Sequence, residues 1–356
     1  MSSMTDLRIL FVARNFPPVI GGLEKNAEDF YRNVRQIAHV DLLANPLGRK
    51  NLINFTIKTF FFLVKNSRKY DVIHFNDAVL SFMIPLISIF SRAKKTFTVH
   101  GLDVVFDNPI YQFVTRLFLK QADLVFAISQ YTAHQCIARG VRPDKLRIIP
   151  DGITPESRQK YDQKEISAFL DKHKIVIQNR KILVSIGRLV ARKGHAWFIQ
   201  SVFPHIKDDH IYIIGGDGPE RRGLLQLIAK LGFSDQVYAV GRVSEKEKKI
   251  IYQIADLFIM PNISVDNDPE GFGIVLLEAG NNSIPVIATD IEGISSAVLD
   301  GITGRLIPEG DVERFIQAIS DPKIDRTTIR PTIEQKFNWI NIAQQYIDEF
   351  QELLQK

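Results

Sequence analysis

The chain has 356 residues, of which 45% are apolar and 24% are charged, so it is expected to be a soluble globular protein of about two domains. Its single cysteine, Cys136, excludes an internal disulfide framework and suits a reducing compartment such as the cytoplasm. The sequence has no zinc-ligand spacing, helix-turn-helix signature or aromatic-rich platform, so we expect no nucleic-acid partner.

Short apolar runs alternate with helical stretches along the whole chain. Six runs in the first half are predicted strands: residues 7–13, 39–44, 71–75, 95–100, 123–129 and 146–150. Six more follow in the second half: residues 181–187, 211–216, 236–241, 256–261, 284–289 and 303–308. This alternation is typical of open, mainly parallel sheets that helices cover on both faces. The sequence therefore predicts an α/β protein with two Rossmann-like, doubly wound domains.

Basic charge is concentrated in the first half of the chain. Residues 1–160 carry 22 Lys and Arg against 13 Asp and Glu, whereas residues 161–356 carry 23 against 27. Two apolar stretches with basic flanks, 55–69 and 78–95, lie in that half, and both are short of the roughly 20 apolar residues that span a bilayer. Two interpretations stay open. The protein binds peripherally to an anionic membrane surface, such as the inner face of the cytoplasmic membrane, or these are core helices beside an ordinary solvated basic face.

The stretch between the two sets of strands is polar. Residues 155–174 contain no strong strand signal, so we place the domain boundary there. The N-terminal domain is expected over residues 1–165 and the C-terminal domain over residues 175–337. The last residues, 338–356, form a helical pattern with no strand after it. Such a helix must dock on a domain that is already built.

Three glycine-rich turns mark candidate ligand sites, because ligands of open α/β sheets bind at strand carboxyl ends, where a following helix presents free amides. The first contains Gly21 and Gly22, after the first strand. The second is residues 215–218, which include Gly216, and the third is residues 269–274. A single turn of this kind is weak evidence, since glycine serves any tight turn.

Two cations follow the first strand of the second domain. Arg188 and Lys193 come just after residues 181–187, beside the expected helix N-termini. Cations in such a position neutralise a diphosphate without a metal ion. Asp266 and Asp268 imitate an Asp-x-Asp metal site, but the two cations make a metal redundant, and we expect none.

A carboxylate stands in the apolar run that follows the third turn. Residues 274–279 are apolar on nearly every face of a helix, which indicates a buried element. Glu278 lies within this run and must find a partner, because an unpaired buried carboxylate is costly.

The motif GRLVARKG (187–194), followed by EGFGIVLLEA (270–279), resembles the retaining, nucleotide-sugar-dependent glycosyltransferases of the group-1 or family-four type. Glu270 and Glu278 match the paired-glutamate motif of that family. The resemblance covers most of the chain, including the turn at Gly21 and TVHGLD around His100. It implies the GT-B fold, in which two Rossmann-like domains face each other across a cleft. In that fold the C-terminal helix docks back toward the N-terminal domain.

The resemblance also implies a donor site for a nucleoside-diphosphate sugar. Glu278 is expected to accept hydrogen bonds from the ribose hydroxyls, so that its partner is the ligand. Arg188 and Lys193 are expected to neutralise the diphosphate, while Arg242 and Val243 meet the nucleobase. The remaining residues assigned to donor binding are Gly21, Gly22, Gly216, Gly271, Phe272, Gly273 and Ile274.

The implied reaction is the transfer of a hexose with retention of anomeric configuration. His100 and Glu270 are expected beside the transferred sugar, and with Arg188 and Lys193 they form the expected catalytic set. The acceptor hydroxyl attacks from the leaving-group face, and the departing phosphate takes its proton. The implied acceptor is a glycan or a lipid-linked glycan in cell-envelope polysaccharide or lipopolysaccharide synthesis, with neither cofactor nor metal.

Three positions depart from the family pattern. Ser283 stands where a glycine is common, Ser296 where a glutamate is common, and Asp151 where an asparagine is frequent. None is expected to touch the core of the site. Two other functions stay open: a catalytically silent nucleotide-sugar-binding subunit, and a nucleotide-sugar epimerase or phosphorylase on the same architecture.

Overall fold

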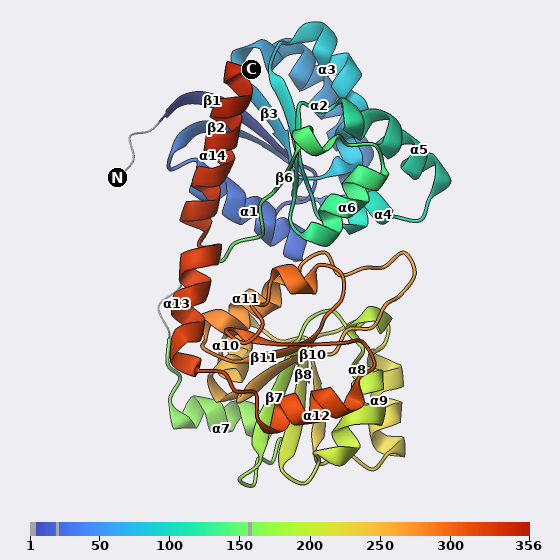
Figure 1. The fold of residues 1–356 in the computed structure, drawn as a ribbon, viewed down its shortest axis with the longest axis vertical. Coiled ribbons are helices and arrows are strands. Elements are labelled where there is room, and N and C mark those ends of the chain that lie inside the picture. The colour runs from blue at the N-terminus through green and yellow to red at the C-terminus, as the bar shows by residue number, and fades with distance from the viewer. Residues whose placement is uncertain (1–4, 19–20, 156–158) are drawn as a thin grey trace. The chain divides into compact units, whose positions relative to one another are not determined.

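The computed structural model describes residues 5–18, 21–155 and 159–356, which fold into two compact units (Figure 1). Each unit is built around one parallel sheet with helices on both faces. All twelve predicted strands are present, and they divide between the two sheets as the sequence pattern indicates. Unit 1 comprises Met1–Thr154, Asn267–Phe272 and Phe337–Lys356, and unit 2 comprises Pro155–Asp266 and Gly273–Lys336.

The sheet of unit 1 has the strand order β2-β1-β3-β4-β5-β6, with every pair parallel. The chain passes from β1 to β2 and then returns to the other side of β1 to continue with β3. This reversal is the topological switch point, where ligands of open α/β sheets bind at the strand carboxyl ends. The strands are β1 (Thr5–Ala13), β2 (Ala38–Ala44), β3 (Val72–Phe75), β4 (Lys94–Val99), β5 (Leu124–Ala127) and β6 (Leu146–Ile148).

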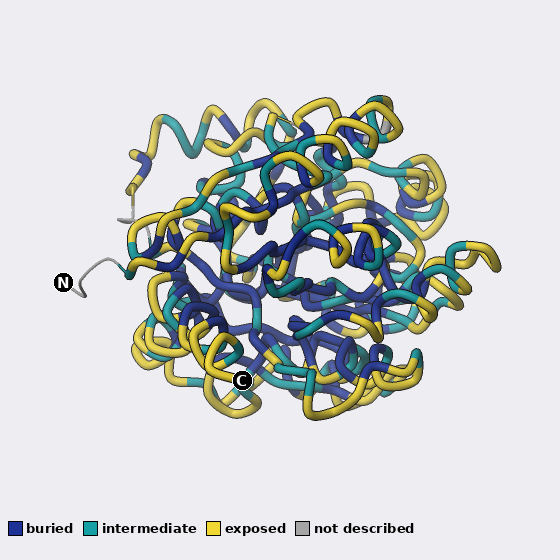
Figure 2. Tube along the Cα trace, turned by 90° about the horizontal axis from the view of Figure 1, so that it is seen from above, coloured by how far each residue is buried: buried dark blue, intermediate teal, exposed yellow. Residues whose placement is uncertain are grey.

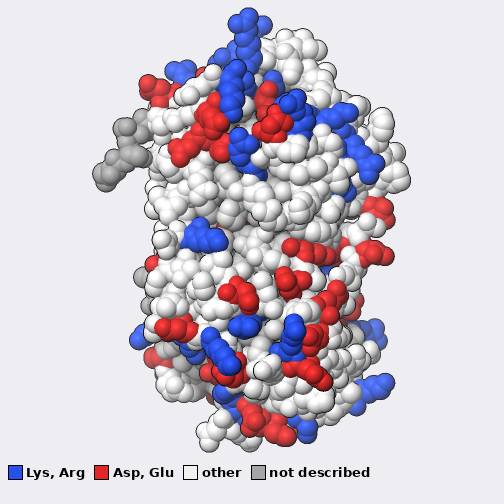
Figure 3. All heavy atoms as spheres, viewed as in Figure 1, with Lys and Arg blue, Asp and Glu red and all other residues white. Residues whose placement is uncertain are grey.

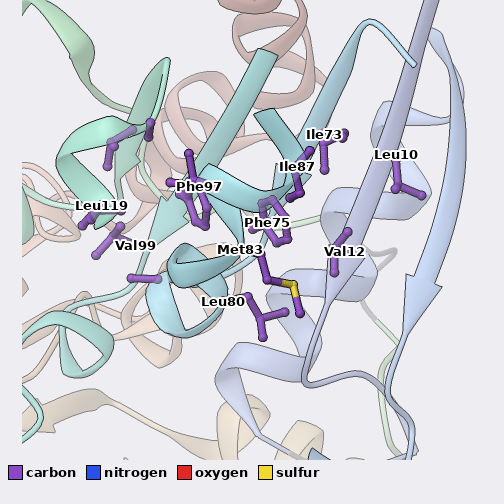
Figure 4. Packing of buried hydrophobic residues seen from close by; sticks show 14 of the residues in the cluster. Leu10, Val12, Ile73, Phe75, Leu80, Met83, Ile87, Phe97, Val99 and Leu119 are labelled. Atoms are coloured by element: carbon purple, nitrogen blue, oxygen red, sulfur yellow. The ribbon is translucent and has the colours of Figure 1, made fainter. Parts of the chain in front are cut away.

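Alternate side chains of β1 enter two separate hydrophobic cores, as expected for a strand that is buried on both faces. Leu10 and Val12 pack with side chains of α2, α3 and the 3₁₀ segment Ala78–Met83 (Figure 4). Ile9 and Phe11 pack on the opposite face with α1 and α14. The helices of unit 1 are α1 (Gly22–Val34), α2 (Leu52–Asn66), α3 (Ile84–Phe90), α4 (Leu102–Val105), α5 (Pro109–Phe118), α6 (Gln130–Ala138) and α14 (Trp339–Gln355).

The C-terminal helix α14 packs on the sheet of unit 1, which confirms the predicted docking on the N-terminal domain. A buried chain of hydrogen bonds fixes it there. The Tyr346 hydroxyl contacts Thr98 Oγ1 at 3.0 Å, and that oxygen contacts His74 Nε2 at 3.1 Å. His74 is fully buried, and burial lowers its pKa to about 3. The imidazole is therefore neutral and serves as a packing and hydrogen-bonding group.

The sheet of unit 2 has the strand order β12-β11-β10-β7-β8-β9, so its switch point lies between β10 and β7. Buried residues gather in the interior of the structure, and exposed residues lie mostly at its periphery (Figure 2). The strands are β7 (Lys181–Ile186), β8 (His210–Gly215), β9 (Val237–Gly241), β10 (Leu257–Met260), β11 (Val286–Thr289) and β12 (Gly304–Ile307). The helices are α7 (Gln163–Lys172), α8 (His195–Trp197, prolonged to His205), α9 (Arg221–Lys230), α10 (Glu245–Ile254), α11 (Ile274–Asn281), α12 (Val312–Ser320) and α13 (Arg326–Phe337).

The division into units differs in two places from the expected domains 1–165 and 175–337. Unit 2 already begins at Pro155, because the segment before α7 packs on α10: Tyr161 and Gln253 exchange hydrogen bonds of 2.7 and 2.9 Å. Residues 267–272, from the second half of the sequence, belong to unit 1. That assignment depends on backbone packing, which the sequence pattern does not reveal.

Candidate active site

The loop after β7 carries Lys193 and is held rigidly at the switch point of unit 2. Gly194 has φ +64°, and a Cβ atom there would lie 1.8 Å from the carbonyl oxygen of Pro261. Only glycine fits this approach. Lys193, immediately before it, is 8% exposed, whereas Arg188 at the start of the loop is exposed. The two predicted cations therefore have different settings, one enclosed and one in solvent.

A buried polar network fixes His195, which follows this loop. His195 Nδ1 lies 2.9 Å from the Tyr212 hydroxyl, which contacts Ser185 Oγ at 2.6 Å. Ser185 in turn donates to the carbonyl of Ile259 on β10. Burial, together with the nearby charge of Lys193, lowers the pKa of His195 to about 3. The network links β7, β8, β10 and α8 without adding a charge.

The glycines after β8 let two loops approach each other. A Cβ atom on Gly216 would lie 1.8 Å from the carbonyl oxygen of Gly187, and one on Gly218 would lie 2.2 Å from that of Leu189. The loop after β8 is therefore packed directly on the loop that carries Arg188. This packing is a structural reason for glycine at position 216, beside the predicted contact with a donor.

Glu278 on α11 has two partners inside the protein. Its Oε1 lies 3.1 Å from Lys248 Nζ, and its Oε2 accepts a 2.9 Å hydrogen bond from the Tyr252 hydroxyl. The structure leaves Glu278 partly exposed rather than buried, and the expectation that the ligand is its partner is incomplete, because α10 already compensates the charge. A carboxylate has about four acceptor positions, so acceptor capacity remains after these two contacts. Burial and the charge of Glu278 raise the pKa of Tyr252, which keeps that hydroxyl a donor.

Helix α11 starts at the third glycine-rich turn. Gly273 precedes it with φ +88°, and no side chain caps the first turn of this eight-residue helix. The amides from Ile274 onward therefore carry the partial positive charge of a helix N-terminus. Phe272 has a different environment, because its side chain is buried and its ring lies 6.2 Å from that of Phe337.

His100 lies at the carboxyl end of β4 in unit 1. Its Nε2 is 2.9 Å from the carbonyl oxygen of Asn76, and since a carbonyl only accepts, Nε2 carries the proton. The His100 amide donates to Asp103 Oδ1 at 2.8 Å, which fixes the turn. Burial lowers the pKa of His100, although Asp151 and Asp77 act in the opposite direction. Neutral His100 thus keeps a lone pair on Nδ1.

The backbone of Gly271, and with it the neighbouring Glu270, lies next to His100. A Cβ atom on Gly271 would lie 2.1 Å from the His100 carbonyl oxygen, and one on Gly101 would lie 3.2 Å from Gly271 Cα. Glu270, next along the chain, is 9% exposed. Unit 1 therefore brings together two of the predicted catalytic residues, which are far apart in sequence.

The turn at Gly21 and Gly22 opens α1, with Gly21 as the residue before the helix. A Cβ atom on Gly22 would meet nothing within 4 Å. Packing against the described residues therefore does not require glycine at position 22. In unit 2, exposed Arg242 follows β9, and Val243 packs against Gly215.

Several polar residues of unit 1 were missed by sequence reasoning. Arg14, just after β1, makes a 2.8 Å ion pair with Asp77, just after β3, so the pair bridges the switch point. Asp103 is buried nearby, and burial with the charge of Asp77 raises its pKa to about 7. Arg14 and Asp77 follow the carboxyl ends of predicted strands. The rule that ligands bind at the topological switch point of an open sheet would therefore have identified both from the sequence.

Asp151, one of the departures from the family pattern, acts on His100 through its charge, although no contact with a predicted site residue is seen among the described residues. It is buried, and its Oδ1 accepts a 2.6 Å hydrogen bond from Asn26 on α1. Burial raises its pKa, while the nearby His100 acts to lower it. The residue after β6 therefore influences the electrostatics of His100.

The described residues contain neither a membrane-spanning helix nor a cluster of metal ligands. No helix in residues 5–18, 21–155 and 159–356 is long and apolar enough to cross a membrane. Over the same residues, no three His, Cys, Asp or Glu side chains gather in a way that would hold a metal ion.

The chain is similar to glycosyltransferases over nearly its whole length. The family described as Glycosyl transferases group 1 matches residues 168–339, and the one described as Glycosyltransferase Family 4 matches residues 8–157. A GDP-mannose-dependent alpha-(1-6)-phosphatidylinositol monomannoside mannosyltransferase of Mycobacterium tuberculosis is 25% identical, covering 96% of this chain and 97% of its own. The Amylovoran biosynthesis glycosyltransferase AmsK of Erwinia amylovora is 28% identical, covering 74% of this chain and 65% of its own.

The solved structures show the same fold. HepE of Anabaena, crystallised with UDP, superposes with a TM-score of 0.78 at 21% identity, covering 97% of this chain and all of that one. The two parallel six-stranded sheets and this likeness identify the GT-B architecture. With both family matches and this architecture in place, the chain belongs to the group 1 glycosyltransferases.

Proposed function

We propose that this glycosyltransferase moves a hexose from a nucleoside-diphosphate sugar to a hydroxyl of a glycan or lipid-linked acceptor. The reaction proceeds with retention and without a metal ion, and the product belongs to a cell-envelope polysaccharide or lipopolysaccharide. The arrangement of His100, Glu270 and Gly271 in unit 1 carries this proposal, because it assembles the sugar-side residues of the motif. The phosphatidylinositol monomannoside named for the mycobacterial relative and the amylovoran biosynthesis named for the Erwinia relative support the envelope assignment.

In this proposal unit 2 binds the donor. The amides at the start of α11 and the cations Arg188 and Lys193 stabilise the diphosphate, whose negative charge grows as the glycosidic bond breaks. Glu278, held in place by Lys248 and Tyr252, uses its remaining lone pairs to accept from the ribose hydroxyls. Preorganisation by α10 reduces the entropy lost when the ribose binds.

The sugar-side groups of unit 1 act on the transferred hexose. Neutral His100 offers the Nδ1 lone pair to a sugar hydroxyl, since Nε2 is occupied by the Asn76 carbonyl. Glu270 supplies negative charge beside a ring that becomes positive in the transition state. The acceptor hydroxyl attacks on the leaving-group face, and its proton passes to the departing phosphate oxygen.

The test is a reaction of the purified protein with UDP- and GDP-hexoses and an acceptor extract, in which free nucleoside diphosphate and glycosylated product are both measured. Stoichiometric release of the two supports transfer. A silent subunit would bind nucleotide sugar without release, and an epimerase would alter the sugar without release. The anomeric configuration of the product, determined by NMR, decides between retention and inversion.

Unit 1 also suits docking on an anionic membrane surface, where a lipid-linked acceptor presents its hydroxyl. One face of α2 is apolar and exposed, with Ile53 at 76%, Ile57 at 52% and Phe61 at 66% of full exposure. Residues 42–70 contain six Lys and Arg and no Asp or Glu. An apolar face flanked only by positive charge is typical of helices that lie in the membrane interface.

Helix α5 of the same unit also carries exposed apolar side chains, with Ile110 at 76% and Phe113 at 67% exposure. On the face shown in Figure 3, acidic side chains are more frequent over unit 2 than over unit 1. Lys95 does not belong to the basic surface, because it is largely buried and pairs with Asp123 at 3.6 Å. The candidate docking surface therefore consists of α2 and α5 with exposed Lys58 and Lys65.

A further inference from the structure

Asp103 connects two loops of unit 1 that follow neighbouring strands. Its Oδ1 accepts a 2.8 Å hydrogen bond from the His100 amide, in the loop after β4. Its Oδ2 accepts a 3.1 Å hydrogen bond from the Ala78 amide, in the segment of residues 76–78 after β3. Asp103 is only 8% exposed, so water competes little for these contacts. Each oxygen of the carboxylate thus holds one loop.

The ring of His100 meets the same segment after β3. Its Nε2 donates to the carbonyl oxygen of Asn76 at 2.9 Å, which places the proton on Nε2 and leaves the lone pair on Nδ1. His100 is therefore attached to this segment at two points, through its ring to Asn76 and through Asp103 to Ala78. The contact through Asp103 fixes the His100 backbone at the distance from which the ring reaches the Asn76 carbonyl.

Each of the two loops also has an anchor of its own. The Tyr111 hydroxyl of α5 donates to the carbonyl oxygen of Asp103. In the segment after β3, Asp77 makes a 2.8 Å ion pair with Arg14. Removal of the Asp103 carboxylate should therefore leave these anchors in place and break the link between the loops.

We propose that Asp103 is a positioning residue for the transfer reaction, which orients the His100 imidazole and maintains its Nε2-protonated tautomer. This inference rests on the proposed function, which gives His100 a role beside the transferred hexose. A carboxylate accepts at both oxygens, whereas an asparagine of the same size sets its NH2 group against one of the two amides. Asparagine therefore cannot hold both loops.

The charge of Asp103 makes its positioning role depend on pH. Burial, and then the charge of Asp77, raises the pKa of Asp103 to about 7, while the two amides and Arg14 act in the opposite direction. As the pH falls below 7 the carboxyl group takes up a proton, so it no longer accepts from both amides as an anion. Burial shifts the pKa of three other titratable side chains around it so that they stay neutral near pH 7: His100, Tyr111 and Cys136.

Steady-state kinetics of Asp103→Asn tests the inference against Asp107→Asn, which removes an exposed carboxylate from the same stretch of chain. At pH 8 Asp103→Asn should lower kcat by about 10- to 100-fold with little change in donor KM, and Asp107→Asn should keep the wild-type kcat. Between pH 8 and pH 5 the ratio of wild-type kcat to that of Asp103→Asn should shrink by about fivefold or more, because only wild type loses the anion in this range. A ratio that does not change with pH would overturn the inference.

Nitrogen-15 NMR of the imidazole rings reports the tautomer without depending on activity. The His100 signals, identified by their absence in His100→Gln, should show one Nε2-protonated form in wild type at pH 8 and a mixture of tautomers in Asp103→Asn. An unchanged tautomer in Asp103→Asn would overturn the inference.

A pH titration of wild type by the same NMR method covers the case in which Asp103→Asn does not fold. The His100 signals should then shift with a midpoint near pH 7 while the ring stays neutral, and signals that stay constant between pH 8 and pH 6 would overturn the inference. A wild type without transfer activity would reject the proposed function, and the NMR measurements would still decide whether Asp103 orients His100.

Discussion

The backbone of Gly271 lies against the carbonyl oxygen of His100, so closely that a Cβ atom at position 271 would come within 2.1 Å of that oxygen. Neither atom belongs to a flexible side chain, and an alanine here must therefore displace backbone. The displacement would move Glu270 relative to His100. The close contact thus couples the position of one predicted catalytic residue to the other.

Gly271→Ala is therefore expected to lower kcat strongly, because a misplacement of about 1 Å in a catalytic constellation costs up to about 100-fold. Steady-state kinetics with saturating donor measures the effect. Gly223→Ala is the matched control, since a Cβ atom at this exposed position on α9 meets nothing within 4 Å. It should keep full activity and gain about 0.5–1 kcal/mol of stability. Full activity in Gly271→Ala would show that the contact does not position the site.

The central strands could be predicted from sequence because they are buried on both faces and read as short apolar runs, as β1 and β3 do. That residues 267–272 belong to unit 1 could not be predicted from the sequence. It depends on two backbones that approach closely at Gly101 and Gly271, and a glycine in a turn does not by itself indicate which distant segment it contacts.

The candidate site was predictable to a similar extent. The carboxylates and cations follow from the motif, but the partners of Glu278 depend on how Lys248 and Tyr252 of α10 face α11. Periodicity assigns residues to a helix face without saying which neighbouring helix that face meets. For the same reason the pairing of Asp151 with Asn26, from opposite ends of unit 1 in sequence, became visible only in the structure.

Glu278→Gln is expected to weaken nucleotide-sugar binding, because hydrogen bonds to a charged acceptor are worth roughly 1.5–3 kcal/mol. Isothermal calorimetry gives the affinity, and thermal unfolding reports the second consequence, a lower Tm from the loss of the Lys248 ion pair. Tyr252→Phe is the matched control, since it removes a partner of the carboxylate but keeps its charge. Donor affinity that is equal in Glu278→Gln and wild type would refute the ribose contact.

Arg188→Ala is expected to reduce kcat at saturating donor with little change in Tm, because the side chain is exposed and its charge matters most when the leaving phosphate becomes more negative. Exposed Arg222→Ala serves as the control for loss of one surface charge. Chelation of divalent cations should leave wild-type activity unchanged. A protein that loses activity with chelator and keeps it without Arg188 would require a metal-dependent mechanism.

The buried histidines predict that stability falls in mild acid. His74 and His195 each have a pKa of about 3 in the folded protein, against roughly 6.5 when unfolded. Below pH 6.5 the unfolded chain binds more protons than the folded protein. Each histidine therefore lowers the free energy of unfolding as the pH falls, by about 2 kcal/mol at pH 5.

Urea unfolding at pH 7 and pH 5 measures this loss. His195→Gln should show a smaller loss than wild type, because it keeps a partner for Tyr212 but does not titrate. His134→Gln, at an exposed position, should behave as wild type. A His195→Gln variant with the full pH dependence would assign the effect to other groups.

Membrane docking by α2 and α5 predicts binding to anionic vesicles that depends on both charge and apolar contact. Each Lys or Arg near such a surface contributes about 1 kcal/mol, and salt weakens the attraction because the screening length falls to about 8 Å at physiological ionic strength. Lys58→Gln with Lys65→Gln should reduce co-sedimentation with anionic vesicles, most clearly at low salt. Ile53→Ser with Phe61→Ser should reduce it at every salt concentration, because these side chains enter the interface.

Leu225→Ser is the matched control for the apolar pair, because Leu225 is exposed on α9 and belongs to unit 2. It should bind vesicles as wild type does, and none of the variants should change turnover on a water-soluble acceptor. Equal binding of wild type to anionic and neutral vesicles would remove the electrostatic part of the proposal. If both double variants still bind vesicles as wild type does, α2 is not the docking helix. Its apolar face would then have another partner.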